Sequence, residues 1–121
     1  CPNVNAGFLA FGQDAGHVEK LTAQIKKIAK QPVIMKLTPN VTDITEIAKA
    51  AEAGGADAIS LINTLTGMKI DINRKTFTLA NKTGGVSGPI VHPIAVRMVY
   101  QAAQAVKIPI IGMDPVGGRC D

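Results

Sequence analysis

Short apolar segments alternate with longer amphipathic segments along this chain, and this alternation limits the possible folds more than any other feature of the sequence. In residues 14–30, apolar side chains recur at steps of three and four with lysines between them, which is typical of one face of a helix. The next segment, residues 33–37 (VIMKL), is a short and nearly continuous apolar run. It predicts a strand that is covered on both faces.

The same alternation continues beyond the first strand. Asp43 stands three residues before Glu46, which predicts the start of a second helix, and Gly54 and Gly55 predict its end. Residues 58–62 (AISLI) then predict a second strand, again of the apolar kind found in parallel sheets.

The last third of the chain adds one more helix and one more strand. Residues 66–91 hold no strong period and predict a long excursion with room for a short hairpin. Pro93 suits the first turn of a third helix that runs to Val106, and residues 108–113 (IPIIGM) predict a third strand. Strands that alternate with helices indicate an α/β fold, a parallel sheet with helices outside it.

Three strands are too few to close a barrel. A (β/α)8 TIM barrel takes about 250 residues, so we expect a partial barrel, roughly its middle-to-C-terminal half. A doubly wound sheet stays open, although no GxGxxG motif follows a strand and no P-loop is present. Because the chain begins at Cys1 without a Met and stops just after an apolar run, we expect residues 1–121 to be a piece of one longer domain, with an atypical tail at 114–121.

Composition excludes several classes of protein. Apolar residues make up 46% of the chain, which is enough to bury a core and excludes a disordered protein. No apolar run approaches the roughly 18 to 20 residues of a membrane helix, and no signal peptide is recognisable. Cys1 and Cys120 lack metal-ligand spacing and predict free thiols in a reducing compartment. We therefore expect a cytoplasmic protein without a metal site or membrane contact.

The charge is uneven. The net charge is +4, and no acidic residue lies between Asp71 and Asp114, where several lysines and arginines occur. Nucleic-acid binding is one explanation. However, with three Phe, one Tyr and no Trp, the chain lacks the stacking platform of single-strand binders. We expect a solvated face or a site for a small anionic ligand, and no nucleic acid.

Polar residues lie at the carboxyl ends of the predicted strands, where parallel α/β proteins place their chemistry. Lys36 lies in a strand expected to be buried, so it needs either an anionic ligand or an acid on a neighbouring strand. Asn63 and Thr64 end the second strand. An amide there can serve a planar heterocycle as donor and acceptor, or it can order the following turn.

Two further segments carry groups suited to chemistry. The small residues of 84–89 (GGVSGP) predict a loop whose backbone N–H groups bind an anion or approach a flat ring, or a merely flexible connection. Cys1 would follow a strand that precedes the chain, and a cysteine with a lowered pKa is a nucleophile or a base. His17 is expected on a helix surface and His92 at a helix start, neither with a visible partner for triad chemistry.

The chain resembles the class 1 dihydroorotate dehydrogenases in segments that follow one another in one register: CPNV (1–4), KLTPNVTDI (36–44), GGADAISLINTLTGM (54–68), GGVSGPIVHPIAVRMVYQ (84–101) and IPIIGM (108–113). The resemblance is greatest to the NAD-linked type 1B catalytic subunits. It implies a (β/α)8 barrel that binds FMN, with its active site at the C-terminal face of the strands. The implied reaction is the oxidation of dihydroorotate to orotate in pyrimidine biosynthesis.

The resemblance also implies roles for individual residues toward the substrate. Cys1 matches the cysteine that serves as the catalytic base. Asn3, Asn63 and Thr64 match residues that bind the substrate. These roles suit the reaction, because a thiolate can remove the C5 proton and paired amides suit a planar imide.

Three residues match positions that contact the flavin: Lys36 beside the ring, Ile62 through its backbone, and Gly88. After residue 113 the sequence departs from the family, which continues with a Gly-Gly pair that helps hold the flavin phosphate. Asp114-Pro115 stands here instead. Either the tail is an artefact of the sequence or the phosphate site is altered, since proline lacks a donor and aspartate repels phosphate.

The resemblance further implies partners, and two alternatives stay open beside it. The implied protein is a homodimer that associates with an iron–sulfur flavoprotein subunit, whose FAD and cluster pass electrons to NAD. The first alternative is the related domain of dihydropyrimidine dehydrogenase, which acts on uracil or thymine; CPNV and NTLTGMKID favour dihydroorotate. The second is a catalytically inactive piece, because exposed strand edges and an unfilled core favour aggregation.

Overall fold

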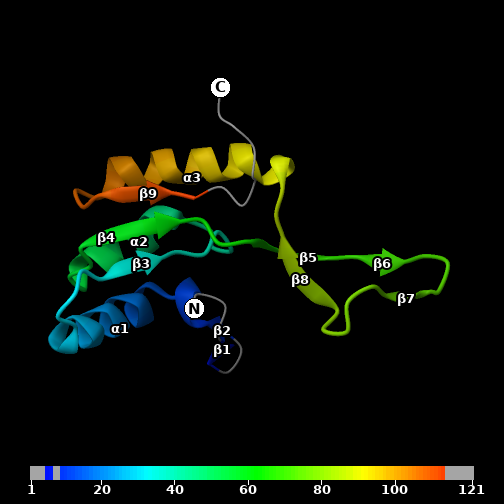
Figure 1. Ribbon diagram of the computed structural model, residues 1–121, viewed down its shortest axis with the longest axis horizontal. Helices are drawn as coiled ribbons and strands as arrows, with labels where there is room; N and C mark the ends of the chain where they lie inside the picture. Colours follow the sequence, from blue (N-terminus) through cyan, green and yellow to red (C-terminus); the bar gives the residue numbers. More distant parts are fainter. Residues whose placement is uncertain (1–4, 7–8, 114–121) are drawn as a thin grey trace.

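A three-stranded parallel sheet forms the centre of the computed structural model, which describes residues 5–6 and 9–113 (Figure 1). In their order across the sheet, the strands are β3 (Ile34–Lys36), β4 (Ala58–Leu61) and β9 (Ile110–Gly112). Spatial order follows chain order without a reversal, and both pairings are parallel. The α/β class expected from the sequence is confirmed.

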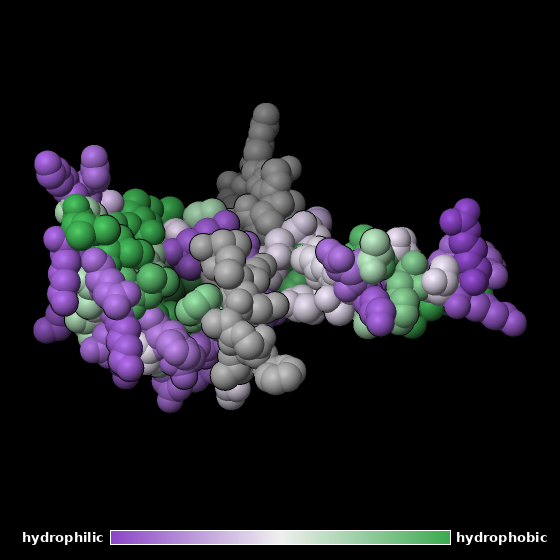
Figure 2. Space-filling model, turned by 90° about the horizontal axis from the view of Figure 1, so that it is seen from below, coloured by the Kyte–Doolittle hydropathy of each residue, from purple (hydrophilic) through white to green (hydrophobic). Residues whose placement is uncertain are grey.

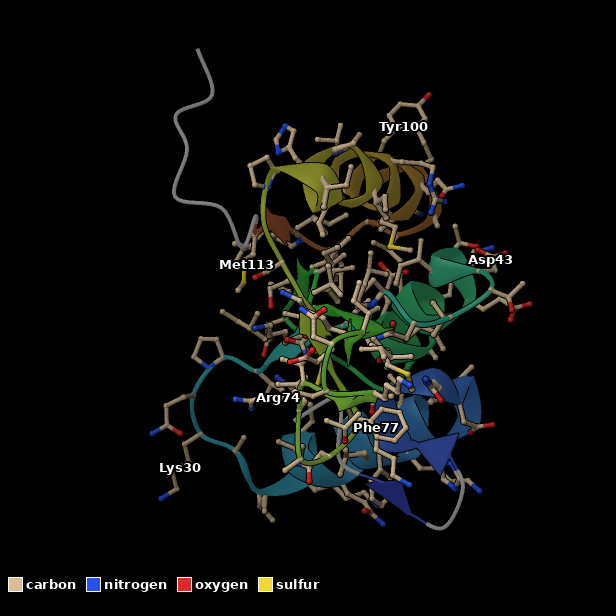
Figure 3. The ribbon with its side chains drawn as sticks, turned by 90° about the vertical axis from the view of Figure 1, so that its right-hand side faces the viewer. Lys30, Asp43, Arg74, Phe77, Tyr100 and Met113 are labelled. Carbon is tan, nitrogen blue, oxygen red and sulfur yellow. The ribbon has the colours of Figure 1, made fainter. Side chains whose placement is uncertain are left out.

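Three helices cover one side of this sheet (Figures 1 and 3). They are α1 (Ala15–Ile28), α2 (Ile44–Ala53) and α3 (His92–Ala105). Helix α2 packs against both α1 and α3, and α2 and α3 both contact β4. A doubly wound sheet carries helices on both faces, whereas the described residues place helices on one face only.

Aspartate caps begin the first two helices. Asp14 Oδ1 accepts a 2.7 Å hydrogen bond from the His17 N–H at the start of α1. Asp43 Oδ1 accepts from the N–H and the hydroxyl of Thr45, at 2.9 and 2.7 Å. The predicted helix start at Asp43 is confirmed, with Thr45 rather than Glu46 as its hydrogen-bonding partner. Each cap satisfies an N–H that has no acceptor inside the helix.

The core lies between the helices and the sheet. Its largest fully buried side chains include Leu37, Ile59 and Leu61, while Ala48, Ala51 and Ala102 are 0% exposed. Alternate residues of a strand face the helices, so the side chains of Ile59 and Leu61 are fully buried between the sheet and the helices. Small residues on α2 and α3 let these helices approach the sheet closely.

The opposite face of β3 differs from the prediction. Ile34 is 51% exposed and Lys36 is exposed, so the expectation of a strand covered on both faces is wrong here. The reason is that β3 is an edge strand of the described sheet, with a neighbouring strand on one side only, whereas the register partners Ala58 and Ser60 on the central strand are buried. Ile111 on β9 is likewise 44% exposed. Figure 2 shows apolar atoms at the surface of this α/β part.

Residues 65–86 form an antiparallel arm that projects from the sheet (Figure 1). The paired strands are β5 (Leu65–Met68) with β8 (Thr83–Val86), and β6 (Ile70–Asp71) with β7 (Thr76–Phe77). The tip of the arm is hydrophilic (Figure 2), and Arg74 and Phe77 lie on the arm (Figure 3). The hairpin expected in this excursion is therefore confirmed.

The glycine-rich segment was expected to be a loop, and its first half is not. Gly84 and Gly85 belong to β8, where they pair with Gly67 and Thr66 of β5. The backbone of Gly84 and Gly85 is therefore engaged in a ladder, while Ser87 and Gly88 lie beyond the end of β8.

Four short elements complete the fold. They are β1 (Asn5–Ala6), β2 (Leu9–Ala10), and the single 3-10 turns η1 (Phe11–Gln13) and η2 (Pro89–Val91). Strands β1 and β2 pair antiparallel. Within the described residues, none of the helices has both the length and the apolar character needed to cross a membrane.

Gly54 gives a first testable prediction, because α1 passes directly over it. A Cβ at this position would lie 2.6 Å from the Glu19 carbonyl oxygen and 2.6 Å from Thr22 Cβ. We expect Gly54→Ala to lower the free energy of unfolding of the full-length protein by about 1–3 kcal/mol, as overpacking does. Urea denaturation measures this change. Gly112→Ala is the control, since its Cβ would meet Val99 at an ordinary 3.6 Å; equal losses in both variants would contradict the prediction.

Asp57 gives a second prediction, on pH dependence. Its carboxylate accepts from Lys26 Nζ at 2.7 Å and from the Val33 N–H at 2.6 Å, joining α1 to the start of β3. The hydrogen bond from Lys26, and next that from Val33, hold the pKa of Asp57 below its usual 3.8. The ionised form thus stabilises the fold above that pH, and this contribution is lost as pH falls through the lowered pKa.

We therefore expect Asp57→Asn to reduce stability at pH 7 and to reduce it less at pH 3. Urea midpoints at the two pH values test this. Glu19→Gln, at an exposed residue of α1, is the control and should show neither change. A loss that is the same at both pH values would contradict the assignment.

Candidate functional site

Backbone hydrogen bonds hold together the carboxyl ends of the three parallel strands. The Asn63 N–H donates to the Leu37 carbonyl at 3.1 Å, which joins the segments after β4 and β3. Met113 donates to the Leu61 carbonyl and accepts from the Ile62 N–H at 3.3 Å, which joins β9 to β4. The segments that leave the strands therefore start from one ordered edge.

A cavity of about 450 Å³ opens between β3 and α1 and reaches this edge at Leu37 and Asn63. Its size falls within the range of small-molecule pockets. Most of its wall is apolar, from Val18, Leu21 and Ile25 of α1 and from residues of β3. Lys36 and Asn63, which the sequence singled out, both line it. The structure thus brings together one cation and one amide in an otherwise apolar hollow.

Lys36 has no ion-pair partner among the residues that the structure describes. The three ion pairs in this part of the chain involve other residues, and the strand neighbour of Lys36 is Ser60. An acid on a neighbouring strand, one of the two alternatives drawn from the sequence, is therefore not found there. The ammonium group remains available to an anionic ligand. The expected burial of Lys36 is wrong, because the side chain is exposed.

Asn40, in the turn after β3, organises the segment that follows β4. Its Nδ2 donates to the Thr64 carbonyl and to Thr38 Oγ1, both at 3.1 Å. Its Oδ1 accepts from the Thr66 N–H at 2.8 Å. One amide thus bridges two segments that lie about 25 residues apart, as its hydrogen-bond partners show.

Thr64 is also confined from the side of the arm. A Cβ at Gly85 would lie 2.8 Å from Thr64 Cβ, so β8 must present a glycine there. This close approach gives Gly85 a packing role in place of the anion-binding role considered for its segment. Thr64 is accordingly fixed at its carbonyl by Asn40 and at its side chain by Gly85.

The remaining predicted flavin contacts lie elsewhere. Ile62 is 2% exposed, and its N–H is used by the Met113 carbonyl. Gly88 has φ +120°, a conformation that favours glycine, and nothing lies within 4 Å of the place of a Cβ. Gly88 does not line the cavity that holds Lys36 and Asn63.

Several predicted positions fall outside the described residues. These are Cys1 and Asn3 at one end of the chain, and Asp114, Pro115 and Cys120 at the other. Their roles remain predictions from the sequence.

Sequence reasoning missed Asn40, which lies within the KLTPNVTDI segment but received no role there. The available signal was its place: Asn40 follows a strand end, at the edge where parallel α/β proteins place their sites. Its partners could not be read from the sequence, because they come from the segment after the next strand.

Comparison with known proteins finds related sequences over most of the chain. The family described as dihydroorotate dehydrogenase matches residues 1–118. Over 93% of the chain, the sequence is 73% identical to dihydroorotate dehydrogenase B (NAD(+)), catalytic subunit, of Lachnoclostridium phytofermentans, and 65% identical to the protein of the same name from Alkaliphilus oremlandii. Over the whole chain it is 58% identical to dihydroorotate dehydrogenase A (fumarate) of Lactobacillus helveticus.

The chain spans 38%, 37% and 39% of the lengths of these three curated relatives, respectively. The family match covers nearly all of the chain itself and includes every segment that forms the ordered strand edge. By this match, the chain belongs to the dihydroorotate dehydrogenase family.

Proposed function

We propose that the protein containing this chain oxidises dihydroorotate to orotate with FMN as its cofactor, in the synthesis of pyrimidines. The observation that carries this proposal is the meeting of Lys36 and Asn63 in one cavity at the carboxyl edge of a parallel sheet. Lys36, a cation without a described acid partner, suits an anionic ligand. Asn63, an amide with both a donor and an acceptor, suits the polar edge of a planar ligand.

The domain is a (β/α)8 barrel in this proposal, and residues 1–121 are part of that single domain. Support comes from strands that succeed one another without a reversal and from helices on one side only. In a closed barrel, the bare face with Ile34, Lys36 and Ile111 becomes the interior. That closure would also cover the apolar surface that the chain exposes on its own.

The residues present fit a flavin on the criterion of charge and polarity. The cavity is mainly apolar, as a ring system requires, and its ammonium group has no described acid competing for it. When bound, FMN supplies the acceptor for the hydride that leaves C6 of dihydroorotate. Lys36 would hold the cofactor by offsetting negative charge. Ile62 and Gly88 do not line this cavity, so in this proposal they would contact, through the main chain, a part of the flavin that extends beyond it.

The substrate roles follow from the same family membership. Asn63 and Asn3 would orient the pyrimidine through their amides, and Thr64 would add a hydroxyl. Cys1, as a thiolate, would remove the C5 proton, which balances the departure of the hydride from C6 and leaves the double bond of orotate. The 121-residue chain on its own would be inactive, because among the residues that the structure describes the parallel sheet ends in open edges.

The electron acceptor is proposed to be NAD, reached through a partner subunit that carries FAD and an iron–sulfur cluster. The relatives with 73% and 65% identity bear the NAD(+) name, which supports this acceptor, although others with that name, at 54% and 50%, lie below the 58% of the relative named for fumarate. A homodimer of the catalytic subunit associated with that partner is the proposed assembly.

Flavin reduction tests the proposed substrate. We expect anaerobic addition of dihydroorotate to the full-length holoenzyme to bleach the visible flavin band, and dihydrouracil to leave it unchanged. Cys1→Ala should abolish the bleaching, because the C5 proton then has no acceptor. Bleaching by dihydrouracil alone would indicate that the protein acts as the pyrimidine-degrading relatives do. Bleaching in the Cys1→Ala variant would show that Cys1 is not the base.

Lys36 gives a separate prediction, with a matched control. We expect Lys36→Met to slow flavin reduction by dihydroorotate about 100-fold, the usual effect of removing one fixed charge-stabilising donor. Lys30→Met removes an equal charge from a side chain that points into solvent (Figure 3). Stopped-flow absorbance gives both rates, and similar rates in the two variants would contradict the role of Lys36.

A further inference from the structure

The segment from Asn63 to Thr66 links the end of β4 to the start of β5. Backbone contacts hold both of its ends, because the Asn63 N–H donates to the Leu37 carbonyl and Leu65 and Thr66 pair with Val86 and Gly85 of β8. Thr64 lies between these ends and belongs to neither strand pairing. A side-chain contact at the Thr64 carbonyl therefore bears directly on the path of the chain at this point.

The side-chain amide of Asn40 makes this contact, and nearly all of its hydrogen-bonding capacity is used. Both Nδ2 hydrogens are used, one on the Thr64 carbonyl and one on Thr38 Oγ1. The Oδ1 acceptor takes the Thr66 N–H. The two contacts on the supported segment flank Leu65, so they fix a carbonyl and an N–H two residues apart. An amide is the side chain that meets this donor and acceptor pair with one planar group.

Thr38 in turn fixes Asn40. Its side chain is buried, with the residue 1% exposed, and its Oγ1 accepts from both the backbone N–H of Asn40, at 3.2 Å, and Nδ2. This pair of bonds limits the rotation of the Asn40 side chain. The support is thus anchored in the core and is not a flexible surface contact.

We propose that Asn40 is a positioning residue for the substrate site, acting through the backbone of Thr64 to Thr66. This inference rests on the proposed function, which assigns Asn63 and Thr64 to the substrate. By holding the Thr64 carbonyl, Asn40 sets the direction in which Asn63 enters the cavity and in which the Thr64 hydroxyl projects. Gly85 packs against the other side of Thr64. Loss of the Asn40 side chain therefore removes the hydrogen bond to the Thr64 carbonyl and leaves the packing against Gly85.

The test compares Asn40→Ala with wild type in the full-length holoenzyme. We expect the Kd for orotate, read from the shift of the flavin spectrum, to rise about tenfold, equivalent to about 1.4 kcal/mol. The KM for dihydroorotate should rise by a similar factor, while kcat changes less than about threefold and the flavin content stays at wild-type level. Asn73→Ala, at an exposed turn of the arm, is the matched control and should bind orotate as wild type does.

Thr38→Val provides a second arm that keeps the amide in place. It removes the acceptor that limits Asn40 while preserving shape, so we expect the Kd for orotate to rise about threefold. If Asn40→Ala fails to fold, this variant decides the question. Unchanged orotate binding in the folded variants, even with a lower melting temperature, would show a purely structural role and overturn the proposal.

Measurements on the wild-type protein distinguish a failure of the positioning role from a failure of the proposed function. If wild type neither binds orotate nor is reduced by dihydroorotate, the proposed function fails and the positioning role fails with it. If wild type does both and the Asn40 and Thr38 variants match it, only the positioning role fails.

Discussion

Backbone hydrogen bonds at the carboxyl ends of three parallel strands are the constraint on which the rest of this structure depends. They join the segment after β3 to that after β4 through Leu37 and Asn63, and β4 to β9 through Leu61 and Met113. Parallel pairing brings these ends to a common edge, so residues far apart in sequence start from neighbouring points. The cavity with Lys36 and Asn63, and the bridge made by Asn40, both begin at this edge.

The two faces of the sheet meet very different surroundings. The face toward the helices is closed by α1, α2 and α3, and its residues Ile59 and Leu61 are fully buried. The other face leaves Ile34 half exposed and Lys36 exposed. An apolar surface of this kind is costly in water, which is why a closed barrel, proposed above, accounts for it. The same closure would place Lys36 in an interior where a single cation strongly affects a bound ligand.

Much of the fold could be predicted from periodicity. Helical steps located α1 and α2, the aspartate at position 43 marked a helix start, and the apolar runs marked β3, β4 and β9 within a residue or two of their ends. The prediction of two covered faces for β3 failed because an apolar run reports which residues avoid water, and not whether a partner is present in the chain. The glycines of β8 were misread because a Gly-rich segment serves loops and close backbone contacts alike; its close contact with Thr64 appears only in three dimensions.

By itself, the sequence determined the order of helices and strands, the α/β class, and the strand-end positions at which Lys36 and Asn63 stand, because these follow from local spacing and composition. The tertiary structure alone decided that these two residues share a cavity, that Lys36 has no described acid beside it, and that Asn40 holds Thr64 and Thr66. These features depend on contacts between segments about 25 residues apart. Such contacts are set by the register of parallel strands, and no local pattern encodes that register.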